Sequence, residues 1–354
     1  MKILIPDHTP PKDIEKLKAM SYDVELVILR VVIKENITRK ILRNIASRVL
    51  SYGLYERIER VCGPQRKYFF YADGKLLVSP LEDIDVFLVS WVVDKDAFKQ
   101  VIPYLPNLKW IHSIKTGIDY LDPDFTEKNK ITVTNSRGVH SERIAEFALA
   151  CLFSISKRIY RHIDLKRRKK WGEIESVDLK GKTVGILGAG SIGNAVAAKC
   201  SALGVKVIGC DLKSSANDNF LEIMALDRLR EVIERSDFFI ICLPLTPETE
   251  GLISFKELSF MKRSAFIINL GRSTVINEKA LIKALEEKAI GGAIFDVFHN
   301  KMQLPNHPFY KFDNVILTHY SAHASESSQR ELFELFIMNM ERYLKGQELL
   351  NVVS

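Results

Sequence analysis

The sequence contains no long apolar segment. No run of apolar residues among its 354 residues approaches the roughly 18 to 20 that a membrane-spanning helix needs. The apolar start, Met1 to Pro6, is also too short for the core of a signal peptide. We therefore expect a cytoplasmic protein that has no membrane partner.

Cysteine is scarce and irregularly placed. The five cysteines are odd in number, are scattered along the chain and form no C-x-x-C pair. This distribution argues against a disulfide framework and against a zinc site, so we expect small buried thiols and no metal. The cysteines are Cys62, Cys151, Cys200, Cys210 and Cys242.

The sequence also lacks a recognisable nucleic-acid-binding motif, although its net charge is +7. The densest basic segment, residues 166–170, has no aromatic residue within it and only Trp171 beside it. A segment of this kind is most often a solvated helix end or loop. We expect no nucleic-acid partner.

The chain does contain enough apolar material for two domains. With 47% hydrophobic and 27% charged residues, it has the balance of a globular protein. Its length exceeds the roughly 250 to 300 residues at which single cores stop growing. Two domains are therefore expected.

Short apolar runs rich in β-branched residues alternate with helix signals over the second half of the chain. Strands separated by such helices predict right-handed βαβ units and a parallel, doubly wound sheet, which places the protein in the α/β class. The runs expected to form strands are residues 183–187, 205–210, 238–243, 265–270, 292–297 and 314–318.

The first third of the chain carries similar signals. Residues 24–33 and 84–90 have the composition of buried parallel strands. Between them lie a helical pattern over residues 41–61 and then Asp73-Gly74, which is flanked by strand-like runs. This dipeptide predicts a β-hairpin with a type I′ turn.

Two amphipathic helices are expected as well. Apolar residues recur every three to four positions over residues 141–160 and 326–344. The apolar stripe of the first helix runs from Ile144 to Ile159 and requires a partner surface.

The run 183–187 leads directly into a glycine motif, and a helical pattern follows. In a strand–turn–helix unit, Gly188 makes the tight turn, Gly190 lets the backbone approach a pyrophosphate and Gly193 lets the helix pack on the strand. The helix N-terminus supplies N–H groups to the phosphates. The sequence therefore predicts a dinucleotide site.

Asp211 ends the next predicted strand, about 20 residues after the motif, where an acid binds the adenosine ribose hydroxyls. A carboxylate at this position also repels a 2′-phosphate, so NAD is favoured over NADP. Lys213 and the two serines that follow it weaken that preference.

Several segments in a fixed order resemble the D-isomer-specific 2-hydroxyacid dehydrogenase family over nearly the whole chain. A set of motifs in the correct order is far more specific than any one of them. The segments are residues 108–111, 116–119, 135–140, 188–193, 243–249, 268–272, 296–298 and 314–318.

The resemblance implies two α/β domains of the Rossmann or flavodoxin type with a cleft between them. A discontinuous substrate-binding domain is expected at 1–137 plus 325–354, and an NAD-binding Rossmann domain at 138–324. The resemblance also implies a homodimer built on the helix at 141–160. An insertion around 34–80 departs from the usual family length.

The resemblance further implies roles for individual residues. Arg272 clamps the substrate carboxylate, a task that suits a planar, always charged guanidinium. Asp296 holds the nicotinamide carboxamide, and Ser191 and Ile192 offer backbone N–H groups to the pyrophosphate. The positions that line the cofactor are Thr116, Leu243, Leu270, Gly271, Arg272 and Asp296.

The sequence departs from the family at the catalytic dyad, which is a histidine proton donor supported by a glutamate. Lys301 stands at the glutamate position and Tyr320 at the histidine position, while His319 replaces a proline. The spacing between the flanking motifs matches without a gap, so both dyad residues are replaced.

Three hypotheses follow from these replacements. In the first, Tyr320 donates the proton to a 2-keto acid and Lys301 supports it, since a nearby cation lowers the pKa of a phenol. In the second, His319 or His323 is the acid. In the third, hydride chemistry is lost and the protein is an NAD(H)-binding sensor or scaffold, although the retained Arg272 argues mildly against this.

Lys115 lies in a loop where the family usually carries small residues that contact the carboxylate. Its ammonium group could bind a second acidic group of the substrate, or it could point to solvent.

Overall fold

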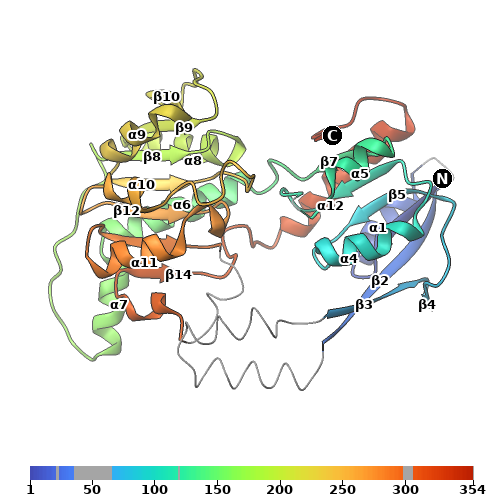
Figure 1. The fold of residues 1–354 in the computed structure, drawn as a ribbon, viewed down its shortest axis with the longest axis horizontal. Coiled ribbons are helices and arrows are strands. Elements are labelled where there is room, and N and C mark those ends of the chain that lie inside the picture. Colours follow the sequence, from blue (N-terminus) through green and yellow to red (C-terminus); the bar gives the residue numbers. More distant parts are fainter. Residues whose placement is uncertain (21–23, 36–65, 119, 298–305, 354) are drawn as a thin grey trace. The chain divides into compact units, whose positions relative to one another are not determined.

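The computed structural model describes residues 1–20, 24–35, 66–118, 120–297 and 306–353. The described residues form two compact units (Figure 1). The first unit contains the described parts of Met1–Asn44 and Arg60–Val139 together with Glu326–Ser354, and the second contains His140–Ser325. The chain thus passes from one unit to the other after Val139 and again after Ser325.

The first unit is built on a seven-stranded sheet with the order β4-β3-β2-β1-β5-β6-β7. The strands from β2 to β7 in this order are parallel, whereas β3 and β4 are antiparallel. The parallel part has the flavodoxin-like strand order 2-1-3-4-5, in which the first strand lies between the second strand and the remaining strands. The strands are β1 (Lys2–Pro6), β2 (Glu25–Glu35), β3 (Arg66–Ala72), β4 (Lys75–Leu76), β5 (Ile84–Val89), β6 (Trp110–Ser113) and β7 (Thr132–Asn135).

The expected hairpin is confirmed. Strands β3 and β4 pair antiparallel, with Tyr71 opposite Leu76. Asp73 and Gly74 have φ values of 46° and 79°, and two positive values in succession are the signature of a type I′ turn. The helical pattern at 41–61 lies outside the described residues, as does the rest of the insertion from 36 to 65.

One helix of the first unit comes from the far end of the chain. Helix α12 (Ser328–Leu344), which confirms the helix expected at 326–344, buries Phe336 and Met340 against the sheet. The ring of Phe336 lies 5.6 Å from that of Trp110 on β6. The other helices of this unit are α1 (Pro11–Lys18), α4 (Lys95–Val101), α5 (Pro123–Lys128) and the 3-10 helix η1 (Ile102–Tyr104).

The second unit is a parallel, doubly wound sheet with the order β10-β9-β8-β11-β12-β13-β14. This arrangement confirms the predicted α/β class. All six predicted strands form, and β10 is an additional strand that the sequence pattern did not indicate. The strands are β8 (Thr183–Leu187), β9 (Lys206–Asp211), β10 (Glu222–Ala225), β11 (Phe238–Ile241), β12 (Phe266–Asn269), β13 (Gly292–Phe295) and β14 (Val315–Leu317).

Helices cover both faces of this sheet. Buried residues of α6 and α8 pack on one face, and those of α9, α10 and α11 pack on the other. The helices are α6 (Ser141–Ser156), α7 (Ile159–Arg167), α8 (Ser191–Ala202), α9 (Leu229–Arg235), α10 (Phe255–Ser259) and α11 (Glu278–Glu286), with the 3-10 helices η2 (Leu226–Arg228), η3 (Ser273–Val275) and η5 (Pro308–Lys311).

The prediction of a single helix over residues 141–160 is wrong in its length. Helix α6 ends at Ser156, because the Ser156 carbonyl accepts the N–H of Val177 and Arg158 turns left-handed at φ 54°. Its apolar stripe, including Leu152 and Ile155, is buried in the core of its own unit beside α8, which provides a partner surface for the stripe.

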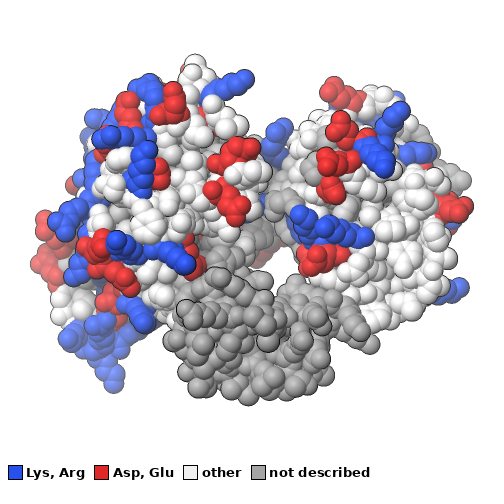
Figure 2. Space-filling view, in the orientation of Figure 1, with Lys and Arg blue, Asp and Glu red and all other residues white. Residues whose placement is uncertain are grey.

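The short helix α7 begins at Ile159 and has no buried residue. Exposed lysines and arginines continue from its last turn to Lys170, and Figure 2 shows a group of basic side chains in this part of the second unit. The basic segment is therefore a solvated helix end, as its composition indicated. Among the described helices, none is long and apolar enough to cross a membrane.

Candidate functional site

Two glycines of the predicted motif are required by close packing. Strand β8 ends at Leu187, and Gly188 turns the chain at φ 100°. A Cβ on Gly188 would lie 3.0 Å from the backbone of Cys242, and one on Gly193 would lie 2.0 Å from the Gly188 carbonyl oxygen. Neither position accommodates a larger residue.

Gly190 is different, because its Cβ position is empty. A Cβ placed there would meet no atom within 4 Å. Gly190 is the N-cap of α8 and provides no side-chain cap for the N–H groups of the first turn, which begins with Ser191 and Ile192. This exposed backbone and helix N-terminus have the form of a pyrophosphate-binding turn.

Asp211 ends β9 next to this turn. Its Oδ2 accepts a hydrogen bond of 2.8 Å from the Ala189 N–H, and its Oδ1 accepts one of 2.7 Å from the Leu212 N–H. The carboxylate is therefore oriented by the glycine turn itself. It lies where an acid would bind ribose hydroxyls of a dinucleotide.

The turns after β11 and β12 meet the glycine turn where the strand order reverses, between β8 and β11. A Cβ on Gly271 would lie 2.5 Å from the Leu243 carbonyl oxygen, and one on Gly188 would lie 3.1 Å from the Leu243 N. Leu270, the residue before Gly271, is buried. The structure thus brings together Gly188, Leu243 and Gly271, and this reversal is where doubly wound sheets bind nucleotides.

The turn that carries Arg272 is shaped by a residue whose role the sequence did not reveal. Asn269 is fully buried, accepts the Gly271 N–H at 3.0 Å and donates to the Arg272 carbonyl at 3.0 Å. Its amide therefore fixes the backbone on both sides of the turn. Arg272 itself is partly buried.

Asp296 anchors the loop at 318–322. Its buried carboxylate accepts hydrogen bonds from the Thr318 hydroxyl at 2.7 Å, the Ser321 N–H at 2.7 Å and the Ala322 N–H at 3.0 Å. These three bonds take most of the roughly four acceptor sites of a carboxylate. If Asp296 also binds the nicotinamide carboxamide, the same carboxylate must serve both the cofactor and this loop.

Tyr320 is held inside that loop. Its N–H donates to the Asp296 carbonyl at 2.9 Å, its side chain is partly exposed, and its ring centroid lies 5.8 Å from that of His319. Its φ of 48° is left-handed, which costs a non-glycine residue roughly 1–2 kcal/mol. Lys301, its predicted partner, lies outside the described residues.

The two predicted residues of the first unit lie in the segment after β6. The Thr116 carbonyl accepts a 2.7 Å hydrogen bond from the Asn135 amide. The Lys115 ammonium donates to the Val93 carbonyl at 2.8 Å and lies 4.7 Å from the centroid of the Tyr120 ring. Lys115 is therefore held by its own unit, and of the two orientations expected for it the structure does not show the one toward solvent.

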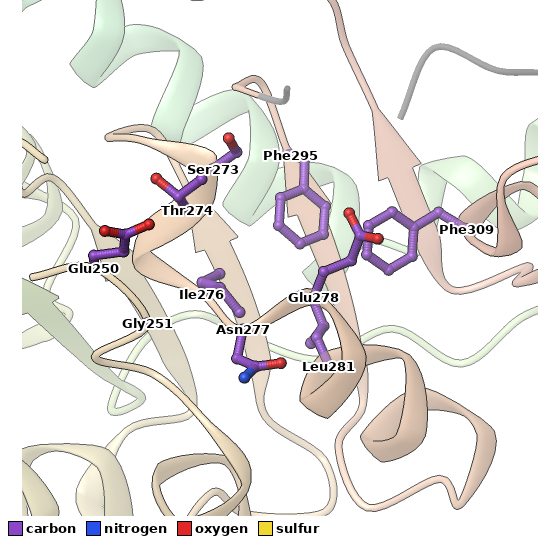
Figure 3. A pocket seen from close by; sticks show the side chains of 10 residues that line it. All are labelled: Glu250, Gly251, Ser273, Thr274, Ile276, Asn277, Glu278, Leu281, Phe295 and Phe309. Atoms are coloured by element: carbon purple, nitrogen blue, oxygen red, sulfur yellow. The ribbon is translucent and has the colours of Figure 1, made fainter. Parts of the chain in front are cut away.

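A cavity of about 310 Å³ follows the Arg272 turn. In Figure 3, Glu250 lies on one side of it and Glu278 on the other, near the stacked rings of Phe295 and Phe309. Two carboxylates and no Lys, Arg or His are among its lining residues, so it does not suit an anionic acid. The lining residues are Glu250, Gly251, Ser273, Thr274, Ile276, Asn277, Glu278, Leu281, Phe295 and Phe309.

Thiol chemistry does not fit the described part of the site. Burial raises the pKa of Cys242, the cysteine beside Leu243, to about 12, and it does the same for Cys200 and Cys210. These thiols stay protonated at neutral pH. Within the described residues no three His, Cys, Asp or Glu side chains come together as metal ligands.

Comparison with known proteins agrees with this geometry. Residues 149–322 match the NAD binding domain of D-isomer specific 2-hydroxyacid dehydrogenase. The chain is similar to the glyoxylate reductase of Thermofilum pendens, with 34% identity over 278 residues that span 77% of this chain and 81% of the relative. It is 30% identical to the D-3-phosphoglycerate dehydrogenase of Methanocaldococcus jannaschii over 283 residues, or 78% of this chain and 53% of that enzyme.

A solved structure shows the same fold. It is a D-isomer specific 2-hydroxyacid dehydrogenase from Xanthobacter autotrophicus Py2 in complex with NADPH and MES. The TM-score is 0.73 at 24% identity, and the match covers 100% of this chain and 97% of that chain.

Proposed function

Since the chain belongs to the D-isomer-specific 2-hydroxyacid dehydrogenase family, we propose that it reduces a small 2-keto acid to the 2-hydroxy acid in an NAD-dependent reaction. The observation that carries the proposal is the meeting of Gly188, Leu243 and Gly271 at the strand-order reversal, with Arg272 next in the chain. The second unit, expected at 138–324, binds the dinucleotide. The first, expected at 1–137 and 325–354, contributes to substrate binding.

NAD is the proposed cofactor because of Asp211. The carboxylate lies against the glycine turn, where it can accept hydrogen bonds from ribose hydroxyls and repel a 2′-phosphate. The Xanthobacter enzyme is in complex with NADPH, so the preference of this chain requires a direct comparison of NADH with NADPH.

Arg272 is the proposed carboxylate clamp. Its backbone is fixed by Asn269, and a guanidinium can hold a carboxylate through two parallel hydrogen bonds. The acidic cavity beyond this turn is unsuited to a keto acid. The substrate carboxylate is therefore expected at Arg272.

Tyr320 is the proposed proton donor and Lys301 its support. NADH, held by the glycine turn and Asp211, would supply a hydride for the carbonyl carbon. The Tyr320 hydroxyl would give its proton to the carbonyl oxygen. The ammonium group of Lys301 stabilises the phenolate that remains until solvent reprotonates it. The loop position and partial exposure of Tyr320 support this role.

The test uses the full purified chain with NADH or NADPH and a panel of 2-keto acids that includes glyoxylate, hydroxypyruvate and 2-keto diacids. Oxidation of NADH with formation of the 2-hydroxy acid is expected, and Arg272→Gln should abolish it while NADH still binds. NADH binding without turnover on any acid would refute the proposal. That outcome would favour the alternative of a non-catalytic NAD(H)-binding sensor or scaffold.

A further inference from the structure

Tyr320 has a backbone conformation that its residue type disfavours, and no local motif explains it. Lys130, Arg158, Lys169 and Lys288 also have positive φ, but each lies two residues beyond the end of a helix. Left-handed residues commonly close helices there. Tyr320 follows no helix, and an outlier of this kind persists only where its surroundings impose it.

The loop around Tyr320 is fixed at its upstream end by strand β13. The Thr318 N–H donates to the Phe295 carbonyl at 2.9 Å, and the Asp296 carboxylate binds the Thr318 hydroxyl. The same carboxylate holds the two N–H groups that follow Tyr320. The backbone of residues 318–322 is therefore tied to one buried acid.

The downstream end of the loop is fixed by a contact between two histidine rings. The ring of His323 lies edge-to-face against that of His140, with centroids 5.3 Å apart and planes at 62°. His140 is only 7% exposed and is the N-cap residue of α6, so it belongs to the packed body of the second unit. Edge-to-face pairs of this kind are favourable and directional.

The two rings also connect distant parts of the chain. His140 is the first residue after the passage from the first unit, and His323 lies just before the passage back after Ser325. The contact therefore ties together both segments that lead to the first unit. An opening of this contact would release the end of the loop that carries Tyr320.

We propose that His140 and His323 are positioning residues, which hold the strained loop so that the Tyr320 hydroxyl is presented for proton transfer. This inference rests on the function proposed for Tyr320. The ring contact performs this task, and no proton passes through either histidine. Phenylalanine should therefore replace His323, whereas alanine should not.

The first test needs no turnover. The full chain is labelled with 3-fluorotyrosine, and the ¹⁹F resonance of Tyr320 is assigned by its loss in Tyr320→Phe. His323→Ala should shift or broaden that resonance, and His323→Phe should leave it near the wild-type position. His162→Ala, at an exposed histidine of α7, is the matched control and should change nothing.

The second test measures kinetics with the 2-keto acid that the panel identifies. His323→Ala should lower kcat by about tenfold or more, as expected for a misplaced reacting group, while KM and NADH affinity change by less than about twofold. His323→Phe should recover kcat to within about threefold. His140→Ala added to His323→Ala should have little further effect, because the contact is already lost.

The outcomes separate this inference from the proposed function. If His323→Phe is as inactive as His323→Ala, His323 is itself the acid and the positioning role is wrong. If His323→Ala alters neither the Tyr320 resonance nor kcat in an active enzyme, the positioning role of the two histidines is refuted while the proposed function stands. If the wild-type chain has no turnover but the resonance still responds, the proposed function fails and only the loop contact remains.

Discussion

The backbone N–H of Ala189 donates a hydrogen bond of 2.8 Å to Oδ2 of Asp211, so the acid at the end of β9 holds the glycine turn that follows β8. One carboxylate thus has two tasks, because it orients the turn and supplies the charge that should exclude a 2′-phosphate. Two substitutions can separate these tasks.

Asp211→Asn removes the charge and keeps one acceptor oxygen, which can still accept the Ala189 N–H, while the oxygen that accepts the Leu212 N–H becomes an amide NH2 group. We expect the affinity for NADPH relative to that for NADH to rise by about tenfold or more, since charge-assisted hydrogen bonds contribute about 1.5 to 3 kcal/mol. Asp211→Ala should in addition weaken both cofactors, because the turn loses its anchor. Fluorescence titration with both cofactors measures this, and equal affinities in the wild-type chain would contradict the assignment.

Tyr320→Phe should lower kcat by a factor of about 10² to 10⁴, the usual contribution of a positioned acid, and should leave NADH affinity nearly unchanged. The competing hypothesis expects His319→Asn or His323→Asn to abolish turnover instead. Nearly full activity in Tyr320→Phe would exclude the tyrosine as donor.

Lys301→Met should move the basic limb of the kcat–pH profile to higher pH, because the phenolate loses a stabilising cation.

His112 should make the protein sensitive to acid. Its imidazole is fully buried on β6, and burial lowers its pKa from 6.5 to about 3. Below about pH 6.5, His112 therefore binds a proton in the unfolded chain but not in the folded chain. The free energy of unfolding falls as the pH falls, by about 1.4 kcal/mol per pH unit.

Urea unfolding at pH 7.5 and pH 5.0 measures this effect. His112→Phe keeps a ring against Trp110 and Phe336, which both contact the imidazole. The free energy of unfolding of this variant should fall by about 2 kcal/mol less between the two pH values than that of the wild-type chain. An identical pH dependence in the two proteins would show that His112 does not carry the effect.

The family resemblance implies a homodimer built on the helix at 141–160, and we predict that its interface includes α7, which begins within that range. Ile159 and Ile163 are each 47% exposed on this helix, whose residues are not buried in their own unit. Ile159→Glu with Ile163→Glu should convert a dimer into a monomer in sedimentation velocity at micromolar concentration. Leu221→Glu, at another exposed apolar residue of the second unit, is the control and should remain dimeric. A monomeric wild-type chain would refute the proposal.

The sequence predicted the parts of the fold that depend on short-range patterns. The strands of the second unit are continuous apolar runs, and Gly188 and Gly193 stand where a Cβ would collide with backbone. The break between α6 and α7 could not be predicted from short-range patterns. Lys157 and Arg158 are good helix formers, and the helix ends because Val177 binds the Ser156 carbonyl.

Two features of the candidate site could not be predicted from the sequence, because they depend on contacts seen only in the folded chain. Asn269 stands within a recognised motif, but its role appears only when both of its hydrogen bonds are seen. The contact between His140 and His323 joins residues far apart in the chain, and no single-sequence pattern encodes such a pair.

The C-terminal helix α12 completes the first unit, and residues close behind it finish the sheet edge, where the Val353 N–H donates to the Val133 carbonyl on β7. The second unit, by contrast, consists of one continuous segment over its described residues. During synthesis, its sheet can form while the first unit still lacks a helix that buries Trp110. The nucleotide-binding half should therefore mature first on the ribosome, and the other half should remain exposed to chaperones until translation has passed residue 353.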